Sequence, residues 1–176
     1  LMARFIIVGM LVLAAIAGAL LYYNQVYAFY EEVQAGAEDV RLTNLVTGQA
    51  EPILFDSFEG IDADSSPIRY RACFTTPLSQ AMLTETFIIR DDAEPLVAPS
   101  WFDCFDAAQI GADIESGEAI AFLGVSNITY GIDRLVSIYP DGRAYAWHQI
   151  NECGEVVFNR EPVPEDRPPN PQNQEK

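Results

Sequence analysis

The residues best suited to chemistry in this 176-residue chain are Cys73, Cys104, Cys153 and the only histidine, His148. In an oxidising compartment two of the cysteines can form a disulfide, so three pairings are possible and one thiol remains. We favour Cys73 with Cys104, because this bond would join a predicted strand, Arg-Ala-Cys-Phe, to the start of a predicted helix, Trp-Phe-Asp-Cys-Phe. A disulfide that closes this loop of 31 positions stabilises a fold by about 3–4 kcal/mol in the chain-entropy description. Cys153 would then be a small buried hydrophobe or would bridge to another chain.

Other reactive constellations are missing from the sequence. One histidine is too few for a blue-copper site, and neither Cys-x-x-Cys nor the haem-attaching Cys-x-x-Cys-His occurs. Segment 62–66 resembles the start of a calcium loop, but the required glycine is missing and the twelfth position is Cys73 instead of glutamate. Gly-x-Ser-x-Gly, His-Glu-x-x-His and glycine-rich phosphate loops are also absent. We therefore expect a non-catalytic protein without cofactor or metal; a thiol-redox protein using Cys153, assisted by His148, is an alternative.

Charge is distributed unevenly along the chain. All 26 acidic residues lie at or beyond Glu31, together with nine of the ten basic residues, so this region carries a net charge of −17. Such a domain repels nucleic acid and anionic lipid, and it attracts cationic partners. The acidity either steers a cationic periplasmic protein toward this domain or simply keeps the domain soluble.

The elements that must position these residues begin with an apolar segment. Residues 5–23 follow Arg4 without a charge, which is close to the roughly 20 residues that a helix needs to cross a bilayer. Five aromatic residues typical of a membrane–water interface come next: Tyr22, Tyr23, Tyr27, Phe29 and Tyr30. The positive-inside tendency places the N-terminus in the cytoplasm and the domain outside it. A cleavable signal peptide is the alternative, because 15–17 and 17–19 resemble cleavage sites.

Small residues mark one face of this predicted anchor. Ala14 pairs with Gly18, and Ala15 with Ala19, at the spacing that lets membrane helices approach closely. Alanine is common in membrane spans, so the pattern is also compatible with no packing role. A packing face would add a membrane-protein complex to the lipid as an expected partner.

The remaining pattern predicts an α+β domain with a mostly antiparallel sheet and one or two packed helices. We divide the chain into the anchor with its aromatic collar (1–30), an acidic juxtamembrane spacer (31–40), the acidic domain (41–160) and a disordered proline-rich tail (161–176). The expected strands are 41–47, 68–75, 119–126, 134–139 and 143–150, with 156–158 as an additional last strand. Residues 52–58 form a second apolar run, 86–90 would be a strand end, and 59–67 a loop. The expected helices are 80–85, capped by Ser79, and 101–114, capped by Asp103. Pro140-Asp141-Gly142 predicts a hairpin.

Several segments together resemble a known group of proteins. These are Tyr-Tyr-Asn-Gln-Val-Tyr-Ala-Phe-Tyr-Glu-Glu-Val (22–33), Arg-Tyr-Arg-Ala-Cys-Phe (69–74), Trp-Phe-Asp-Cys-Phe-Asp-Ala (101–107) and Pro-Pro-Asn-Pro-Gln (168–172). The chain resembles, over nearly its whole length, a family of uncharacterised small membrane-anchored proteins from α-proteobacteria of the Rhodobacter and Paracoccus group. The resemblance implies a bacterial inner-membrane location with a periplasmic domain, and it implies no activity and no catalytic residues.

Our leading hypothesis is a non-catalytic accessory or assembly subunit of a larger inner-membrane complex, such as a respiratory or photosynthetic one. The main alternative is a periplasmic sensor or ligand-binding module, which predicts a concave apolar pocket between the sheet and the helices.

Overall fold

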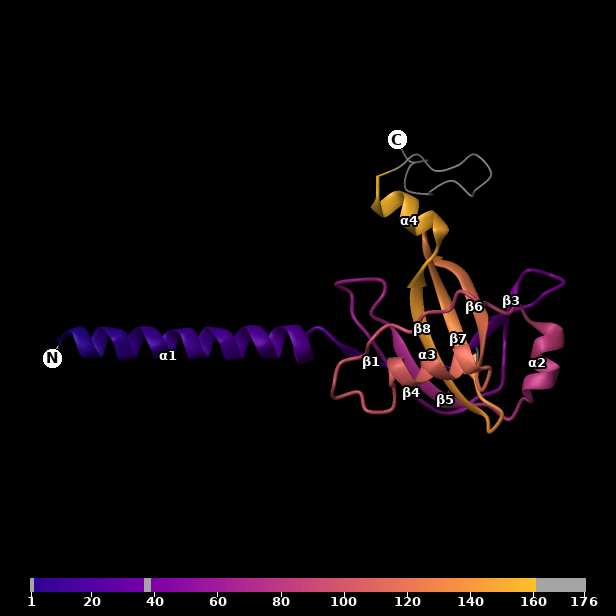
Figure 1. The fold of residues 1–176 in the computed structure, drawn as a ribbon, viewed down its shortest axis with the longest axis horizontal. Helices are drawn as coiled ribbons and strands as arrows, with labels where there is room; N and C mark the ends of the chain where they lie inside the picture. Colours follow the sequence, from indigo (N-terminus) through magenta and orange to yellow (C-terminus); the bar gives the residue numbers. More distant parts are fainter. Residues whose placement is uncertain (1, 37–38, 161–176) are drawn as a thin grey trace.

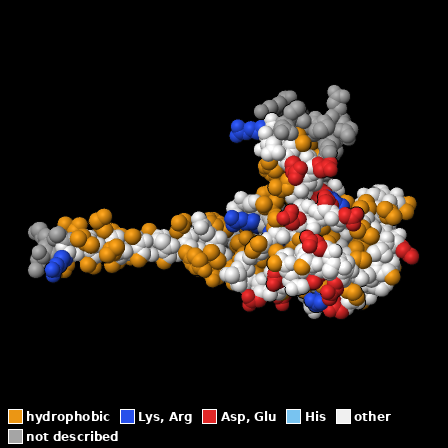
Figure 2. Space-filling view, viewed as in Figure 1, with side chains coloured by type: hydrophobic (Ala, Val, Ile, Leu, Met, Phe, Trp, Pro, Cys, Tyr) orange, Lys and Arg blue, Asp and Glu red, His pale blue; other side chains and the backbone are white. Residues whose placement is uncertain are grey.

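The computed structural model describes residues 2–36 and 39–160, so the tail expected over 161–176 lies outside the described residues. Helix α1 (Met2–Tyr23) projects from the domain and continues into a π-helical turn, η1 (Asn24–Ala28) (Figure 1). The stretch Arg4–Ala28 is 25 residues long and apolar enough to cross a bilayer, and the domain does not bury it. Figure 2 shows hydrophobic side chains along this helix and acidic side chains scattered over the domain.

The domain is built on a six-stranded antiparallel sheet with the order β1-β4-β5-β8-β7-β6. Its strands are β1 (Glu31–Val33), β4 (Asp56–Asp62), β5 (Arg71–Thr75), β6 (Ile120–Thr129), β7 (Ile132–Ile138) and β8 (Arg143–Ile150). A two-stranded sheet consists of β2 (Arg41–Thr43) and β3 (Ala50–Pro52). The helices of the domain are α2 (Gln80–Thr86), α3 (Ala107–Ser116) and α4 (Glu152–Phe158). This arrangement confirms the predicted α+β class.

Side chains alternate between the two faces of the large sheet, so each face carries its own apolar core. One core lies between the sheet, the β2–β3 pair and α2; it includes Leu42, Phe74, Leu83, Phe122 and Val136. The other core lies under α3 and residues 98–107; it includes Ile61, Phe105, Ile110, Leu135 and Trp147. The second core positions the site described below.

Two local predictions agree closely with the structure. Strands β7 and β8 form the hairpin expected around Pro140-Asp141-Gly142, and Gly142 has a φ of +87°. A Cβ at Gly142 would lie 2.5 Å from the Thr76 carbonyl oxygen, so both the turn and the close approach require glycine. Ser79 caps α2 by accepting a hydrogen bond from the Met82 amide.

The predicted spacer and loop differ from the structure. Residues 31–33 are not the end of the anchor helix but strand β1, which pairs with β4 through Glu31–Asp62, Glu32–Ile61 and Val33–Gly60. Correspondingly, β4 extends to Asp62, through residues that the sequence assigned to a loop. The pairing satisfies backbone groups at the β4 edge and packs Val33 on the first core.

Two further predictions were wrong. Helix α3 begins at Ala107, because Asp106 and not Asp103 caps it, accepting from the Ala108 and Gln109 amides. Residues 101–104, including Cys104, therefore lie in the loop before the helix. The strand expected over 156–158 is helical. The Asn151 side chain caps α4 by accepting hydrogen bonds from the Cys153 and Gly154 amides. This cap outweighs the preference of Val156 and Val157 for a strand.

Candidate functional site: an acidic cleft beside helix α1

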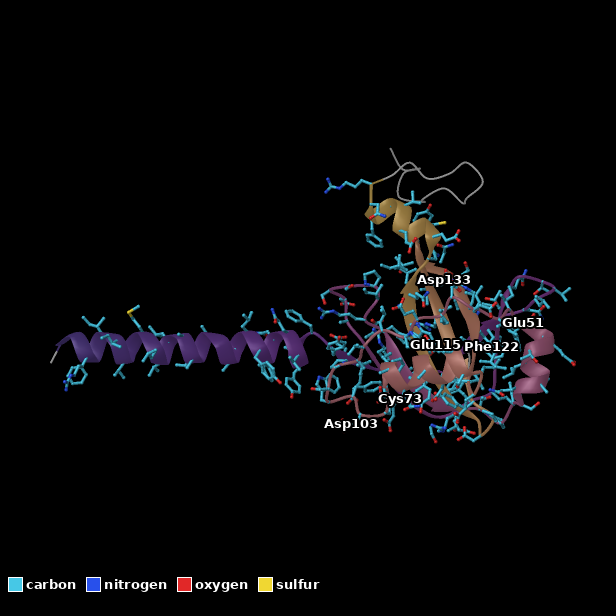
Figure 3. All side chains as sticks on the ribbon, in the orientation of Figure 1. Glu51, Cys73, Asp103, Glu115, Phe122 and Asp133 are labelled. Atoms are coloured by element: carbon cyan, nitrogen blue, oxygen red, sulfur yellow. A yellow bond between two sulfur atoms is a disulfide. The ribbon has the colours of Figure 1, made fainter. Side chains whose placement is uncertain are left out.

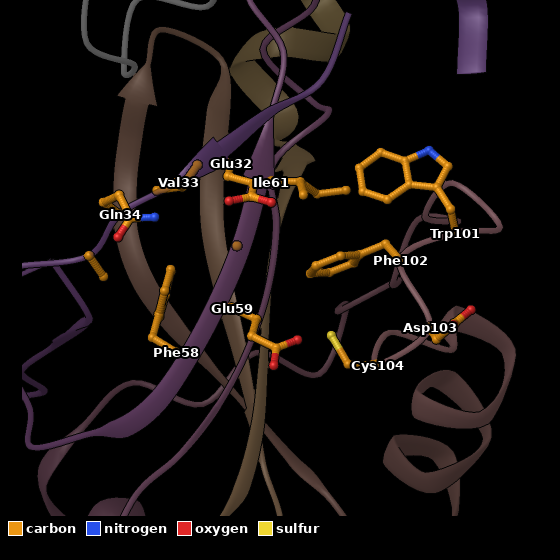
Figure 4. Close-up of a pocket in the computed structure, with 12 residues that line it drawn as sticks. Glu32, Val33, Gln34, Phe58, Glu59, Ile61, Trp101, Phe102, Asp103 and Cys104 are labelled. Carbon is orange, nitrogen blue, oxygen red and sulfur yellow. The ribbon is translucent and has the colours of Figure 1, made fainter. Parts of the chain in front are cut away.

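A cleft of about 520 Å³ lies between the β1–β4 edge of the large sheet and residues 101–104. Figure 4 shows Glu32 and Glu59 on the strand side and the rings of Trp101 and Phe102 on the opposite side, with Ile61 between them. Figure 3 places Asp103 on the side of the domain that carries the anchor. We call this feature the acidic cleft.

Strand register brings the two glutamates of the acidic cleft together. Glu32 is paired with Ile61, and Glu59 lies two positions before Ile61 on β4, so all three side chains share one face of the sheet. Gly60 permits the close packing of this edge, because a Cβ there would lie 2.7 Å from the Phe58 ring and 3.3 Å from Val33 Cβ. Both carboxylates are exposed, and no ion pair to either of them is found among the described residues.

A disulfide holds one end of the opposite wall. Cys73 and Cys104 are bonded, with their Cα atoms 6.3 Å apart, and this is the pairing favoured from the sequence. Cys73 is also the register partner of Glu59. The bond therefore fastens the loop wall to the strand beside Glu59, and Figure 4 shows Glu59 directed across the cleft toward Cys104.

The end of the N-terminal helix, at η1, holds the other end of this wall. Trp101 Nε1–H donates a hydrogen bond of 2.7 Å to the Val26 carbonyl oxygen, one of the last carbonyls of the helix and hence without a helical partner. The Trp101 ring stacks on Tyr27 at 6.1 Å between centroids and meets Tyr30 edge-on at 5.8 Å. Tyr27 in turn stacks on Tyr23, so part of the predicted aromatic collar forms a continuous ring stack with the cleft wall.

A buried arginine fixes the segment that leads into the wall. Arg71 is 4% exposed and donates through Nε to the Leu96 carbonyl at 2.7 Å and through Nη2 to the Val97 carbonyl at 3.2 Å. Its Nη1 donates to the carbonyls of Ile68 and Tyr70. Burial lowers the pKa of Arg71 to about 10, although the nearby Tyr30 and Asp62 oppose the shift. The guanidinium joins residues 68–70 to residues 96–97 through hydrogen bonds, so its role is structural.

The acidic cleft combines the two features that bind organic cations. Carboxylates accept charge-assisted hydrogen bonds from ammonium and guanidinium groups, and aromatic faces attract the same cations through their quadrupoles. Neither arginine nor lysine is among the residues that line it. The arrangement is suited to a lysine or arginine side chain or to a small amine. Among the described residues, no group of three His, Cys, Asp or Glu side chains is arranged to hold a metal ion.

His148 lies elsewhere, on the opposite face of the sheet, and its ring is fully engaged. Its Nδ1 lies 2.6 Å from the Pro67 carbonyl oxygen, and Arg134 Nε–H donates to Nε2 at 3.0 Å. Because the carbonyl can only accept and the guanidinium can only donate, the ring is neutral with its proton on Nδ1. Burial, followed by the charges of Arg134 and Arg71, lowers the pKa of His148 to about 4, although the bond to Pro67 opposes this.

The structure therefore does not join His148 to Cys153, as the thiol-redox alternative requires. Cys153 is buried in the first turn of α4, and neither ring nitrogen of His148 has it as a partner. The expected packing face, by contrast, is exposed: Ala14, Ala15, Gly18 and Ala19 lie on α1, and a Cβ at Gly18 would meet no atom within 4 Å.

Sequence reasoning missed the acidic cleft. Glu32 was assigned to a spacer and Glu59 to a loop, so nothing placed them on one sheet face. The signal that could have found the opposite wall was the pair Trp101-Phe102 directly before Cys104, because the favoured disulfide carries these rings to the strand that contains Cys73.

Comparison with known proteins identifies the family but no activity. Residues 40–168 match a family described as "Family of unknown function (DUF6446)", and the chain belongs to this family. No curated protein and no solved structure matches the chain significantly. The acidic cleft extends beyond the matched region, since Glu32 precedes it and Glu59 and Trp101 lie within it.

Proposed function

We propose that the protein is a non-catalytic, single-span accessory subunit that docks on a larger complex of a bacterial inner membrane. Helix α1 would be an uncleaved anchor with its N-terminus in the cytoplasm, and the acidic domain would lie in the periplasm. Three observations support this location: the length and apolar character of Arg4–Ala28, the full exposure of the apolar part of α1 outside the domain, and a disulfide suited to an oxidising compartment.

The acidic cleft carries the docking proposal. It would receive a lysine or arginine side chain of a cationic partner, such as a subunit or substrate protein of an electron-transfer complex. The net charge of −17 beyond residue 30 would raise the local concentration of such a partner, while Glu32, Glu59 and the Trp101 ring would select one cationic group. Because the carboxylates are exposed, added salt should weaken the contact.

The small-residue face of α1 supports a second point of contact within the membrane. The space around Gly18 is open in the isolated chain, so a partner helix could approach the backbone there. This contact would hold the subunit on its complex, and the acidic cleft would provide specificity.

Site-specific cross-linking in native membranes tests the proposal. A photo-reactive residue replacing Gln34, an exposed residue of the cleft lining, should cross-link to one defined membrane-complex partner. The same residue replacing the exposed Val46 on the β2–β3 turn is the position control. Combining the Gln34 probe with E32Q and E59Q should abolish the cross-link. The same probe with E85Q, which removes an exposed charge from α2, should retain it.

The results can contradict each part of the proposal. A cross-link that survives E32Q with E59Q, or that is unchanged by high salt, would show that the acidic cleft does not select a cation. A protein that always runs as a lone monomer in gentle detergent, and whose deletion changes no membrane complex, would refute the accessory role.

The volume of the acidic cleft favours one second candidate, a sensor for a small cationic ligand. About 520 Å³ is within the range of small-molecule sites, although the lining is acidic and not the apolar pocket expected from the sequence. Calorimetric titration of the full chain with butylammonium separates the candidates. Saturable binding that E59Q abolishes, without any partner cross-link, would favour the sensor.

A further inference from the structure

An apolar segment of the domain lies directly beside the end of the anchor. Residues 96–101 read Leu-Val-Ala-Pro-Ser-Trp and carry no charge. Val97 is 82% exposed, although the domain has two apolar cores. Val97 and the three residues after it form one wall of a shallow groove of about 340 Å³, and Tyr22, Gln25 and Val26 of the anchor form the other wall.

The contacts that hold this segment are rigid and lead to the anchor. Arg71 binds the carbonyls of Leu96 and Val97 from beneath, and the Trp101 indole donates to the Val26 carbonyl. The backbone on both sides of Val97 is therefore fixed, whereas the Val97 side chain itself faces outward. Exposure here does not arise from a loose loop.

The depth of the segment follows from the length of the helix. At 1.5 Å per residue, the 25 residues of Arg4–Ala28 extend about 37 Å, which exceeds a hydrocarbon core of about 30 Å. With Arg4 at the opposite boundary of the hydrocarbon core, the excess of about 7 Å places residues 24–28, with Gln25 and Val26, in the headgroup region and Tyr22 at its border, where tyrosine and tryptophan are favoured. Val97 shares a groove with these residues, so it lies at the same depth.

We propose that residues 97–101 form a second membrane contact, an interfacial loop that inserts into the boundary between lipid headgroups and acyl chains beside the anchor. This inference rests on the membrane anchor proposed above. A single helix leaves the domain free to tilt, whereas two contacts joined by the Trp101–Val26 hydrogen bond fix its orientation. The acidic cleft shares Trp101 with the loop, so it would open at a defined height above the bilayer.

Two features of the loop indicate that lipid is what contacts residues 97–101. The loop is continuous with the aromatic stack of Tyr23 and Tyr27 at the end of the anchor. The first charge after it, at Asp103, is on the cleft side and limits insertion to the uncharged residues. We expect the Val97 side chain to insert shallowly, and Trp101 to lie at the end of the inserted segment.

Spin labels on the full chain in phosphatidylcholine vesicles test this inference. Single cysteines replace Leu11 in the anchor, Val97 in the loop or Val46 at the end of the domain opposite the anchor, each in a C153S background that keeps the Cys73–Cys104 disulfide. Val46 is the matched control, because it is also a valine and is 90% exposed. The measurement compares collision rates of each label with lipid-soluble oxygen and with a water-soluble nickel chelate.

The loop proposal predicts that oxygen collisions exceed nickel collisions for the labels at Leu11 and Val97, and that the order is reversed for the label at Val46. A water-like label at Val97, with a lipid-like label at Leu11, would overturn the interfacial loop and leave the anchor intact. Equal collision ratios at Val97 and Val46 would overturn it as well. A water-like label at Leu11 would refute the anchor, and with it both the proposed function and this inference.

Discussion

Replacing His148 with glutamine should make the folded domain less sensitive to acid. His148 is 6% exposed and neutral, stacked on Tyr70 at 4.7 Å and hydrogen-bonded to Arg134 and Pro67. Protonation would place a cation against the Arg134 guanidinium and remove the acceptor for its Nε–H. The side chain of H148Q does not titrate, so this penalty would be absent from the variant.

The magnitude follows from the pKa of His148. Its ordinary value of 6.5 is lowered to about 4 in the folded protein, and each unit of difference corresponds to about 1.4 kcal/mol. The unfolded chain therefore takes up the proton first as the pH falls. The stabilisation from neutral His148 is complete above pH 6.5 and is lost as the pH falls toward 4, with a total of about 3 kcal/mol.

Denaturant unfolding of the full chain in detergent micelles, followed by the tryptophan fluorescence of Trp147 and Trp101, measures this effect. The 26 carboxyl groups titrate in both proteins, so the informative quantity is the difference in unfolding free energy between wild type and H148Q. The wild type should lose roughly 2–3 kcal/mol more than the variant between pH 7.5 and 4.5. Because His148 is the only histidine, its proton resonances report its pKa directly.

Two results would refute this reasoning. One is a His148 resonance that titrates near 6.5 in the folded protein, which would mean that the ring is neither buried nor held by Arg134. The other is a stability difference between wild type and H148Q that does not change with pH.

Four other variants test contacts that hold the domain together. Replacing Cys73 and Cys104 together with alanine should cost about 3–4 kcal/mol of unfolding free energy by thermal or denaturant melts, and an unchanged stability would contradict a structural bond. D133A should lower the unfolding free energy by about 3–5 kcal/mol, because the buried Asp133 carboxylate pairs with Arg90. D141A removes an exposed pair with Arg143 and should lower it by less than about 1 kcal/mol. Equal losses in the two variants would be inconsistent with the difference in burial. G154A should destabilise α4 by at least about 1 kcal/mol, since a Cβ there would overlap the Gly131 carbonyl oxygen. A neutral result would mean that this contact relaxes.

Local sequence signals predicted those elements whose causes are local. Ser79 was found because a cap acts on amides two or three residues away, and the β7–β8 hairpin was found because its turn residues fix their own backbone. Helix α3 was misplaced because both Asp103 and Asp106 are residue types that cap helices, and the local pattern does not choose between them. In the structure Asp106 is the cap, and long-range contacts, the Cys73–Cys104 bond and the Trp101–Val26 hydrogen bond, hold residues 101–104 in a loop. Strand β1 was missed because three residues carry too little periodicity without the β4 edge that pairs with them.

The sequence by itself determined a long uncharged helix, a strongly acidic domain behind it and a cysteine pairing that was favoured among three. These follow from composition and from residues near one another in the chain. Only the tertiary structure determined that the acidic cleft exists. Glu32, Glu59 and Trp101 come from three distant segments, and sheet register, the disulfide and the end of the N-terminal helix bring them to one cleft. Such contacts depend on how strands pair across the fold, which no local pattern in the chain encodes.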